Sequence, residues 1–370
     1  MNKLHKVFML LLILGFSITS CSEGKNKETN NFSLKKSEVV ISHGDLLLNN
    51  RSHLRKITGQ DSLLSLSLDA QQFVIFDLKT KRPVYSIDIA LDGPDFFDVQ
   101  PKDLEVRDER LYVLSKNYFS VYTLEGEIIA RFDANDFKGM NTDYFIDEFE
   151  LINLDLVLFN KASFEAVGGV NRSESPQNIF MTLDMKSKTI NELNIYPPKE
   201  ALVDVPEKGY YNDFSDHEMI YSNDSIIYSF RFSSKTYVYD MANGKTTVLD
   251  TKSNLTANLR ESVGRDALKS GQKYGDYTFS GPKFSRWSKD DKSGYYARIH
   301  YELRPLPDGG LDKYKSLMLL NPKLEVVAEF EIDDRVWEPA IFINGKIYAQ
   351  KVDQTIEDGF EYMVYELEMD

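Results

Sequence analysis

The sequence predicts an all-β fold, and within that class a β-propeller, on three observations. Apolar and polar residues alternate with a period of two in short runs from about residue 62 to the C-terminus, which is the pattern of half-buried strands. Tyr and Phe number 21 and 23 against 2 Trp, and both favour strands. A strand–turn–strand unit recurs along the chain, so we expect one repeated structural element.

The repeated unit is a pair of apolar strands joined by a polar turn that contains Gly, Asn or Lys. The turn centres fall near residues 80, 126, 186, 243 and 322, at spacings close to or above the ~40–50 residues of a four-stranded blade. Such units cannot bury both faces alone, but radial stacking covers them. We therefore favour six blades, with seven next, since the widest gap could hold one extra hairpin. A β-sandwich without repeats, or two β domains, is the alternative.

Local signals predict four further elements: two hairpin turns, a strand and a helix. Asn243-Gly244 and Asn344-Gly345 favour type I′ hairpin turns, in which both central residues have positive φ. A strand around residues 39–48 is expected to complete the last blade and close the ring. Residues 254–270 carry apolar residues near helical spacing, so they predict a helix inserted over one face.

The first 20 residues have the parts of a bacterial export signal. Lys3 and Lys6 precede an apolar run from Val7 to Phe16, and small or polar residues follow up to Ser20, as in signal peptides. The run is shorter than the ~20 residues of a membrane-spanning helix. Residues 1–20 are therefore expected to be a signal peptide.

Cys21 is the single cysteine of the chain. The segment Ile18-Thr19-Ser20-Cys21 resembles the lipobox of bacterial lipoproteins, with a branched apolar residue first and a small residue before the cysteine. This predicts a lipid on Cys21 that anchors the protein to a membrane of the cell envelope, with the outer membrane favoured and the leaflet open. An ordinary signal and a free thiol is the alternative. Residues 21–31 are polar and predict a flexible tether, which leaves 32–370 as the propeller domain.

Composition and motifs exclude several functions. The net charge of −14 argues against nucleic acid, which favours clustered Lys and Arg. A single cysteine allows no internal disulfide, no thiolate zinc site and no Cys–His nucleophile. The five histidines lack metal-binding spacing, and neither a phosphate-binding loop nor a nucleophile elbow occurs. We predict no metal, no cofactor and no catalytic residue.

The segment 284–304 has the most distinctive local chemistry, because arginines, aromatic residues and a histidine alternate in FSRWSKDDKSGYYARIHYELR. Arginine among aromatics is typical of ligand or partner contact, through stacking and recognition of carboxylates. The candidate ligand face consists of Arg286, Trp287, Tyr295, Tyr296, Arg298 and His300. The alternative, which we favour for this segment, is a twisted hairpin whose Tyr and Arg side chains cover one another.

The lipobox, the Tyr- and Phe-rich hairpins and the stretch Phe284–Leu303 together resemble a family of lipoproteins from Bacteroidota, domain of unknown function 4221. The resemblance covers about residues 32–370. It implies an exported lipoprotein with a β-propeller-like fold, and it transfers no catalytic residue.

Two functions fit these observations, and a propeller hosts either. The first is a membrane-tethered binding module that presents one mouth of the ring to a protein, a peptide or a glycan of the envelope. The second, which we rank behind the first, is a glycan hydrolase or lyase with acids and His300 or Arg298 at the central mouth. Two carboxylates, or an Arg–His–Tyr group, converging at the central funnel would favour the enzyme, and an aromatic rim without convergent acids would favour the binder. A structural subunit of an envelope complex is a third hypothesis.

Overall fold

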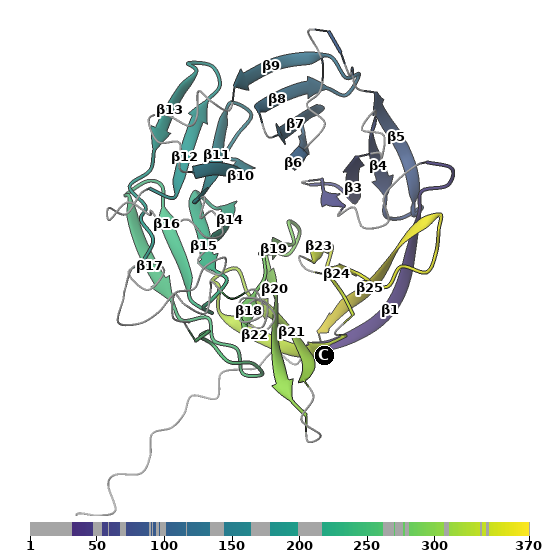
Figure 1. Cartoon of the computed structure of the whole chain (residues 1–370), viewed down its shortest axis with the longest axis vertical. Coiled ribbons are helices and arrows are strands. Elements are labelled where there is room, and N and C mark those ends of the chain that lie inside the picture. The colour runs from purple at the N-terminus through teal and green to yellow at the C-terminus, as the bar shows by residue number, and fades with distance from the viewer. Residues whose placement is uncertain are drawn as a thin grey trace, which may run out of the picture.

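Six antiparallel sheets stand around a central axis as the blades of a propeller in the computed structural model (Figure 1). This confirms the six-bladed fold predicted from the repeats. The structure describes residues 32–369 except for 47–53, 58, 67–71, 89, 91, 94–95, 97–100, 116, 134–143, 164–177, 199–216, 262–269, 271–276, 278–280, 307–310, 334 and 338–339. The expected signal peptide, Cys21 and the expected tether therefore lie outside the described residues.

The first three blades follow one another along the chain, and each places its strands in sequence order from the axis outward. Blade 1 consists of β2 (Arg55–Lys56), β3 (Ser62–Leu66), β4 (Gln72–Asp77) and β5 (Arg82–Asp88), blade 2 of β6 (Pro101–Arg107), β7 (Arg110–Ser115), β8 (Tyr118–Thr123) and β9 (Ile128–Asp133), and blade 3 of β10 (Tyr144–Leu151), β11 (Leu156–Ser163), β12 (Phe180–Asp184) and β13 (Thr189–Glu192).

The next three blades include two variations on this plan. Blade 5 has two short inner strands that pair with the same neighbour, and blade 6 combines the two ends of the chain. Blade 4 consists of β14 (His217–Ser222), β15 (Ser225–Phe230), β16 (Thr236–Asp240) and β17 (Lys245–Leu249), blade 5 of β18 (Lys283–Phe284), β19 (Ser288–Lys289), β20 (Tyr296–Pro305), β21 (Leu311–Leu320) and β22 (Val326–Ile332), and blade 6 of β23 (Ile341–Ile343), β24 (Lys346–Gln350), β25 (Gly359–Met369) and β1 (Phe32–Ser42).

The ring closes where β1, from the start of the described chain, lies beside β25, from its end (Figure 1). The two strands pair along their whole length, from Phe32 opposite Met369 to Ser42 opposite Gly359. The closing strand was expected at 39–48 but spans Phe32–Ser42. Its first half, SLKKSE, has no apolar alternation because an outermost strand is exposed on its far edge and partly on both faces.

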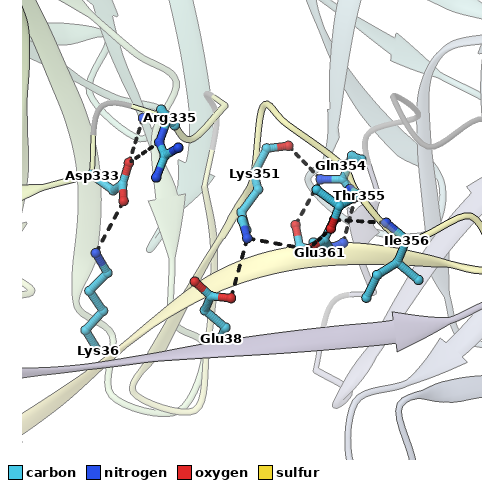
Figure 2. Close-up of polar contacts among 9 residues, drawn as sticks. All are labelled: Lys36, Glu38, Asp333, Arg335, Lys351, Gln354, Thr355, Ile356 and Glu361. Carbon is cyan, nitrogen blue, oxygen red and sulfur yellow. Dashed lines mark hydrogen bonds and ion pairs between the residues drawn. The ribbon is translucent and has the colours of Figure 1, made fainter.

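Ion pairs on the outside of blade 6 support this closure (Figure 2). The ammonium of Lys36 lies 3.4 Å from a carboxylate oxygen of Asp333, which follows β22 of the preceding blade. The ammonium of Lys351 lies 3.4 Å from Glu38 of β1. Both contacts tie the N-terminal strand to C-terminal blades, but surface pairs of this kind contribute at most about 1 kcal/mol each.

The loop between β24 and β25 is held by the buried carboxylate of Glu361 (Figure 2). Glu361 accepts hydrogen bonds from the backbone amides of Thr355 and Ile356 and from the hydroxyl of Thr355, and it pairs with Lys351 at 3.4 Å. Burial alone would raise the pKa of Glu361, but the hydrogen bonds from Thr355 and Ile356 and the charge of Lys351 lower it below its ordinary value. The carboxylate is therefore ionised at neutral pH.

The core lies between neighbouring blades, where middle strands are buried on both faces. Four consecutive residues of β4, Phe73–Phe76, are buried, and so is the middle of β8. The outermost strand β17 is exposed along nearly all of its length. In one interblade contact the ring centroid of Phe119 in blade 2 lies 5.2 Å from those of Phe149 and Phe159 in blade 3. Abundant Phe and Tyr thus fill the spaces between radial sheets.

The two faces of the ring differ. Turns from the first to the second strand of a blade, and from the third to the fourth, lie on one face and are short, as at Asp108-Glu109 and Asn223-Asp224; we call it the short-turn face. The longer connections, such as 351–358, lie on the opposite face, which we call the loop face. In blade 6, Ile343 pairs with Lys346, Lys346 pairs with Glu366, and Glu366 pairs with Lys35. Because Ile343 and Lys346 flank the short turn between β23 and β24, the start of β1 lies at the same end of the blade as this turn. The chain therefore enters β1 from the short-turn face.

Two local predictions differ from the structure. Residues 254–261 of the expected helix are irregular, with one isolated bridge from Leu259 to Ser233, and 262–269 lie outside the described residues. The amide of Ala257 instead donates to Glu302 of blade 5 at 2.9 Å, so tertiary contacts override the local spacing. The widest gap holds this connection and the inner strands of blade 5, and the ring has six sheets, not seven.

The two Asn-Gly turns also differ from each other. Asn344 and Gly345 both have positive φ, as a type I′ turn requires. At 243–244 only Gly244 has positive φ, because the turn is longer than two residues and Asp240 accepts hydrogen bonds from the amides of Ala242 and Asn243 at 2.8 and 3.3 Å. The hairpin is present, but its predicted type is wrong.

Candidate functional site

A pocket of about 270 Å³ lies at the axis of the ring, where the inner strands of all six blades meet. Its wall includes residues near both ends of the inner strands, such as Glu150, next to last of β10, and Ile341, first of β23, so the pocket extends along the axis. Its charged and aromatic wall residues are Arg55, Lys56, Asp103, Glu105, Arg107, Phe149, Glu150, Tyr221, Arg286, Trp287, Lys289, Asp291 and Tyr362.

The inner strands β6 and β10 supply the acids of this wall. Alternate residues of a strand point to the same face, so Asp103, Glu105 and Arg107 share one face of β6, and Glu148 and Glu150 share one face of β10. An inner strand has an unpaired edge at the axis, where charged side chains reach solvent in the pocket. The sequences KDLEVR and DEFEL thereby place acids beside bases at the centre of the ring.

Arg286 is clamped between two of these acids. Its guanidinium lies 3.4 Å from Glu148 and 3.7 Å from Asp103. Asp103 is buried and also accepts a hydrogen bond from the amide of Phe149 at 3.1 Å, and it lies 3.4 Å from Arg55. Burial would lower the pKa of Arg286, but the charges of Glu148 and Asp103 outweigh it and raise that pKa. Arg286 is therefore permanently charged, and the cluster joins blades 1, 2, 3 and 5.

Glu150 differs from the other acids, because no cation among the described residues forms an ion pair with it within 4.0 Å. Burial and then the nearby charge of Glu105 raise its pKa to about 8, although Arg286 opposes the shift. The Glu150 carboxyl is thus mostly protonated at pH 7 and can donate a hydrogen bond.

The remaining wall charges come from Lys56, Asp291 and Lys289. The Lys56 ammonium lies 2.8 Å from the Asp291 carboxylate and donates to the carbonyl of Lys289 at 2.7 Å. The Lys289 ammonium donates to the hydroxyl of Ser222 at 2.8 Å. Among the described residues no carboxylate forms an ion pair with Lys289.

Of the six residues of the candidate ligand face, Arg286 and Trp287 line the pocket. Trp287 is 4% exposed and donates its indole N–H to Ser229 at 2.9 Å. Tyr296 is buried and donates to Ser222 at 2.9 Å. Tyr295 is half-buried, and its ring packs on that of Phe32 at 6.0 Å.

Arg298 and His300 are enclosed in the protein. Arg298 is 2% exposed, donates to the carbonyl of Ser285 at 2.9 Å and lies over the ring of Trp287 at 4.9 Å. Burial lowers its pKa to about 9. His300 is 0% exposed, its ring centroid lies 4.2 Å from that of Phe284, and burial followed by the charge of Arg298 lowers its pKa well below the ordinary value. The six residues therefore do not share one exposed surface.

Sequence reasoning missed Asp103, Glu105, Glu150 and Lys289. The signal for the first three was the alternation of acids on β6 and β10, which would have pointed to the axis had those strands been recognised as innermost. Among the described residues no group of three or more His, Cys, Asp or Glu side chains could hold a metal ion. The same part of the chain contains no helix long and apolar enough to cross a bilayer.

The fold and this pocket define a six-bladed β-propeller with a charged axial site. The chain belongs to the family described as domain of unknown function (DUF4221), whose model matches residues 29–329. A search of curated proteins finds no match.

Two solved structures from Bacteroides resemble the chain. A DUF4221 family member from Bacteroides vulgatus superposes with a TM-score of 0.67 at 13% identity, covering 93% of this chain and 100% of that one. A "Putative exported protein" from Bacteroides fragilis superposes with a TM-score of 0.53 at 10% identity, covering 91% and 95%. At these identities the likeness shows the fold alone.

Proposed function

We propose that the protein is an exported, lipid-anchored binding module that holds a small polar ligand, a glycan or the end of a peptide, in its axial pocket. The observation that carries the proposal is the wall of this pocket, in which charged groups are already ordered by contacts with one another before any ligand is present. A pre-ordered site loses little side-chain entropy on binding. Its volume of about 270 Å³ suits a small molecule.

Export and anchoring are supported by the lipobox at Cys21 and by similarity to the Bacteroides fragilis protein named above. The described chain begins at Phe32, on the short-turn face. A flexible tether over 21–31 would span roughly 20 Å on average. We expect the short-turn face to lie toward the membrane and the loop face away from it.

The ion pairs of the wall favour a binder over an enzyme. The carboxylates of Asp103, Glu105 and Asp291 pair with Arg55, Arg107 and Lys56 at 3.4, 2.7 and 2.8 Å. Burial would raise the pKa of Asp291, but the hydrogen bond and charge of Lys56 lower it, so this carboxylate is a weak proton acceptor. Asp103 and Glu105 are likewise engaged by cations and are not free to contact a substrate.

The proposal is tested on the full-length lipoprotein purified in detergent. Mono- and disaccharides and dipeptides are screened by thermal shift, and positive compounds are titrated by calorimetry. We expect one-to-one binding that Tyr221→Ala in the pocket wall weakens. Tyr85→Ala, on the exposed outer strand β5, is the matched control and should leave binding unchanged. Absence of binding across the panel, or binding indifferent to Tyr221→Ala, would contradict the proposal.

A glycan hydrolase or lyase is the second candidate, and one observation favours it. Asp103, Glu105 and Glu150 converge on the pocket, and a carboxyl whose pKa is raised to about 8 is suited to act as a general acid. Product analysis after incubation with glycans tests it. Glu150→Gln should abolish turnover and keep binding; an unchanged product yield would exclude Glu150 as the acid.

A further inference from the structure

The charges in the pocket wall do not cancel. Five cations line the pocket against four acids. Of these acids Glu150 is mostly neutral at pH 7. The other three wall acids pair with Arg55, Arg107 and Lys56, and Glu148 contacts Arg286, so four of the cations have an acid partner. One positive charge remains at the centre of a protein whose net charge is −14.

The unbalanced cation is Lys289. The three ion pairs above account for Arg55, Arg107 and Lys56, and Arg286 lies between Asp103 and Glu148. The ammonium of Lys289 donates to the Ser222 hydroxyl at 2.8 Å and lies 6.0 Å from the ring centroid of Tyr296. The nearby Asp291 carboxylate feels the charge of Lys289, but it forms its ion pair with Lys56, and among the described residues Lys289 has no carboxylate within 4.0 Å. An ammonium has three donors, so two remain for a ligand.

Lys289 and Glu150 lie on different sides of the axis with blade 4 between them. Lys289 belongs to β19 and Glu150 to β10, and β14, which carries Tyr221, follows β10 around the ring (Figure 1). A ligand in the pocket therefore has an ammonium at one side and a carboxyl at the other. Tyr221, on the blade between these two groups, and Trp287, close to Lys289 in sequence, also line the pocket.

We infer that the axial pocket takes a small saccharide bearing one carboxylate, with the carboxylate on Lys289 and a hydroxyl on Glu150. This inference rests on the proposed function and adds the charge of the ligand. A carboxylate completes the ion pair that Lys289 lacks, and a charge-assisted hydrogen bond is stronger than a neutral one. Sugar hydroxyls accept as well as donate, so they fit a protonated carboxyl.

The test compares three probes on the full-length protein by calorimetry at pH 7: D-glucuronate, its methyl ester, and D-glucose. The ester removes the charge and adds one methyl group, and glucose, which has no carboxyl group, controls for that added bulk. We expect glucuronate to bind at least about tenfold more tightly than the ester or glucose, the loss expected when a hydrogen bond to a charged group is removed. The affinity for glucuronate should fall as salt rises, since salt screens exposed charges.

Lys289→Met keeps an unbranched side chain that is one atom shorter and removes its charge. It should bring the affinity for glucuronate down to that for the ester, and its unfolding midpoint should match that of the parent protein. Lys245→Met, at the start of the exposed strand β17, is the matched control and should keep the preference.

The outcomes separate this inference from the proposed function. If glucuronate, its ester and glucose bind equally well, and Tyr221→Ala weakens all three, the pocket is a binding site but recognition of a ligand carboxylate is contradicted. A preference for glucuronate that survives Lys289→Met would overturn the role of Lys289. Binding of dipeptides but of none of the sugars would contradict the assignment of a saccharide as the ligand. Binding of no compound would contradict the proposed function as well.

Discussion

Phe32 lies opposite Met369 in the last blade, so the two ends of the described chain are neighbours in one sheet. The pairing extends without a register shift to Ser42 and Gly359. Since every other blade is continuous in sequence, this single junction holds the ring closed. The stability of the whole propeller should therefore be sensitive to β1.

Ile41→Ala tests the junction. Ile41 is fully buried and packs in the cluster between blades 6 and 1. Loss of its side chain should lower the free energy of unfolding by about 2–4 kcal/mol, measured by denaturant unfolding. Val248→Ala, 54% exposed on β17, should change it by less than about 0.5 kcal/mol. An unchanged midpoint for Ile41→Ala would show that β1 is dispensable.

Glu361→Gln should destabilise the loop that Glu361 holds. The lowered pKa means that the carboxylate stabilises the folded protein above its unfolded pKa of about 4.5, and that this contribution is lost as the pH falls through the folded value. We expect a loss of about 1–3 kcal/mol at pH 7, shrinking below pH 4, in unfolding curves measured across pH. Glu366→Gln, 41% exposed, should show little effect. A deficit that stays constant as the pH falls from 7 into the range where the protein unfolds in acid would mean that ionisation of Glu361 is not the cause.

Glu150→Gln should stabilise the folded protein at high pH, the opposite of the destabilisation expected for Glu361→Gln. The folded-state pKa of about 8 lies above the ordinary 4.5, so ionisation of Glu150 opposes folding and stability is lost as the pH rises between these values. The loss is at most about 1.4 kcal/mol per pH unit. The variant should match the parent near pH 4.5 and melt at a higher temperature at pH 9. Glu368→Gln, exposed on β25, is the control, and parallel melting curves for parent and Glu150→Gln would refute the assignment.

Cys21→Ala should release the protein from membranes without unfolding it, because the lipid would have no attachment point. Fractionation of cells and immunoblotting measure the release, and circular dichroism of the released protein checks the fold. Ser22→Ala should stay with the membranes. Sedimentation of Cys21→Ala with membranes would contradict the lipid anchor.

The outer hairpins were predictable from sequence, since their turns follow middle strands buried on both faces. The run QFVIFD is apolar because β4 lies between two layers of side chains. The closing strand was harder to place, because the Lys and Glu residues of β1 face solvent. The irregular segment 254–261 was mistaken for a helix because apolar spacing alone does not show which residues are buried, and Leu259 in this segment is 57% exposed.

The candidate site was only partly visible in the sequence. Arg286 and Trp287 reach the pocket, while Arg298 and His300, two and four residues further on, are buried within the protein. Residue type alone does not distinguish these positions. Asp103, Glu105 and Glu150 meet only because β6 and β10 are both innermost, and that relationship depends on the closed ring.

Among the described strands, β1, which completes the last blade, is synthesised first, and its partner β25 is synthesised last. A chain threaded through a translocation pore from its N-terminus would expose β1 throughout transit, while five blades assemble behind it. The sixth could form only after Gly359–Met369 had left the pore. Truncation near the C-terminus would remove the partner strand of β1, so the ring could not close and its unpaired strand edges would be accessible to proteases of the envelope.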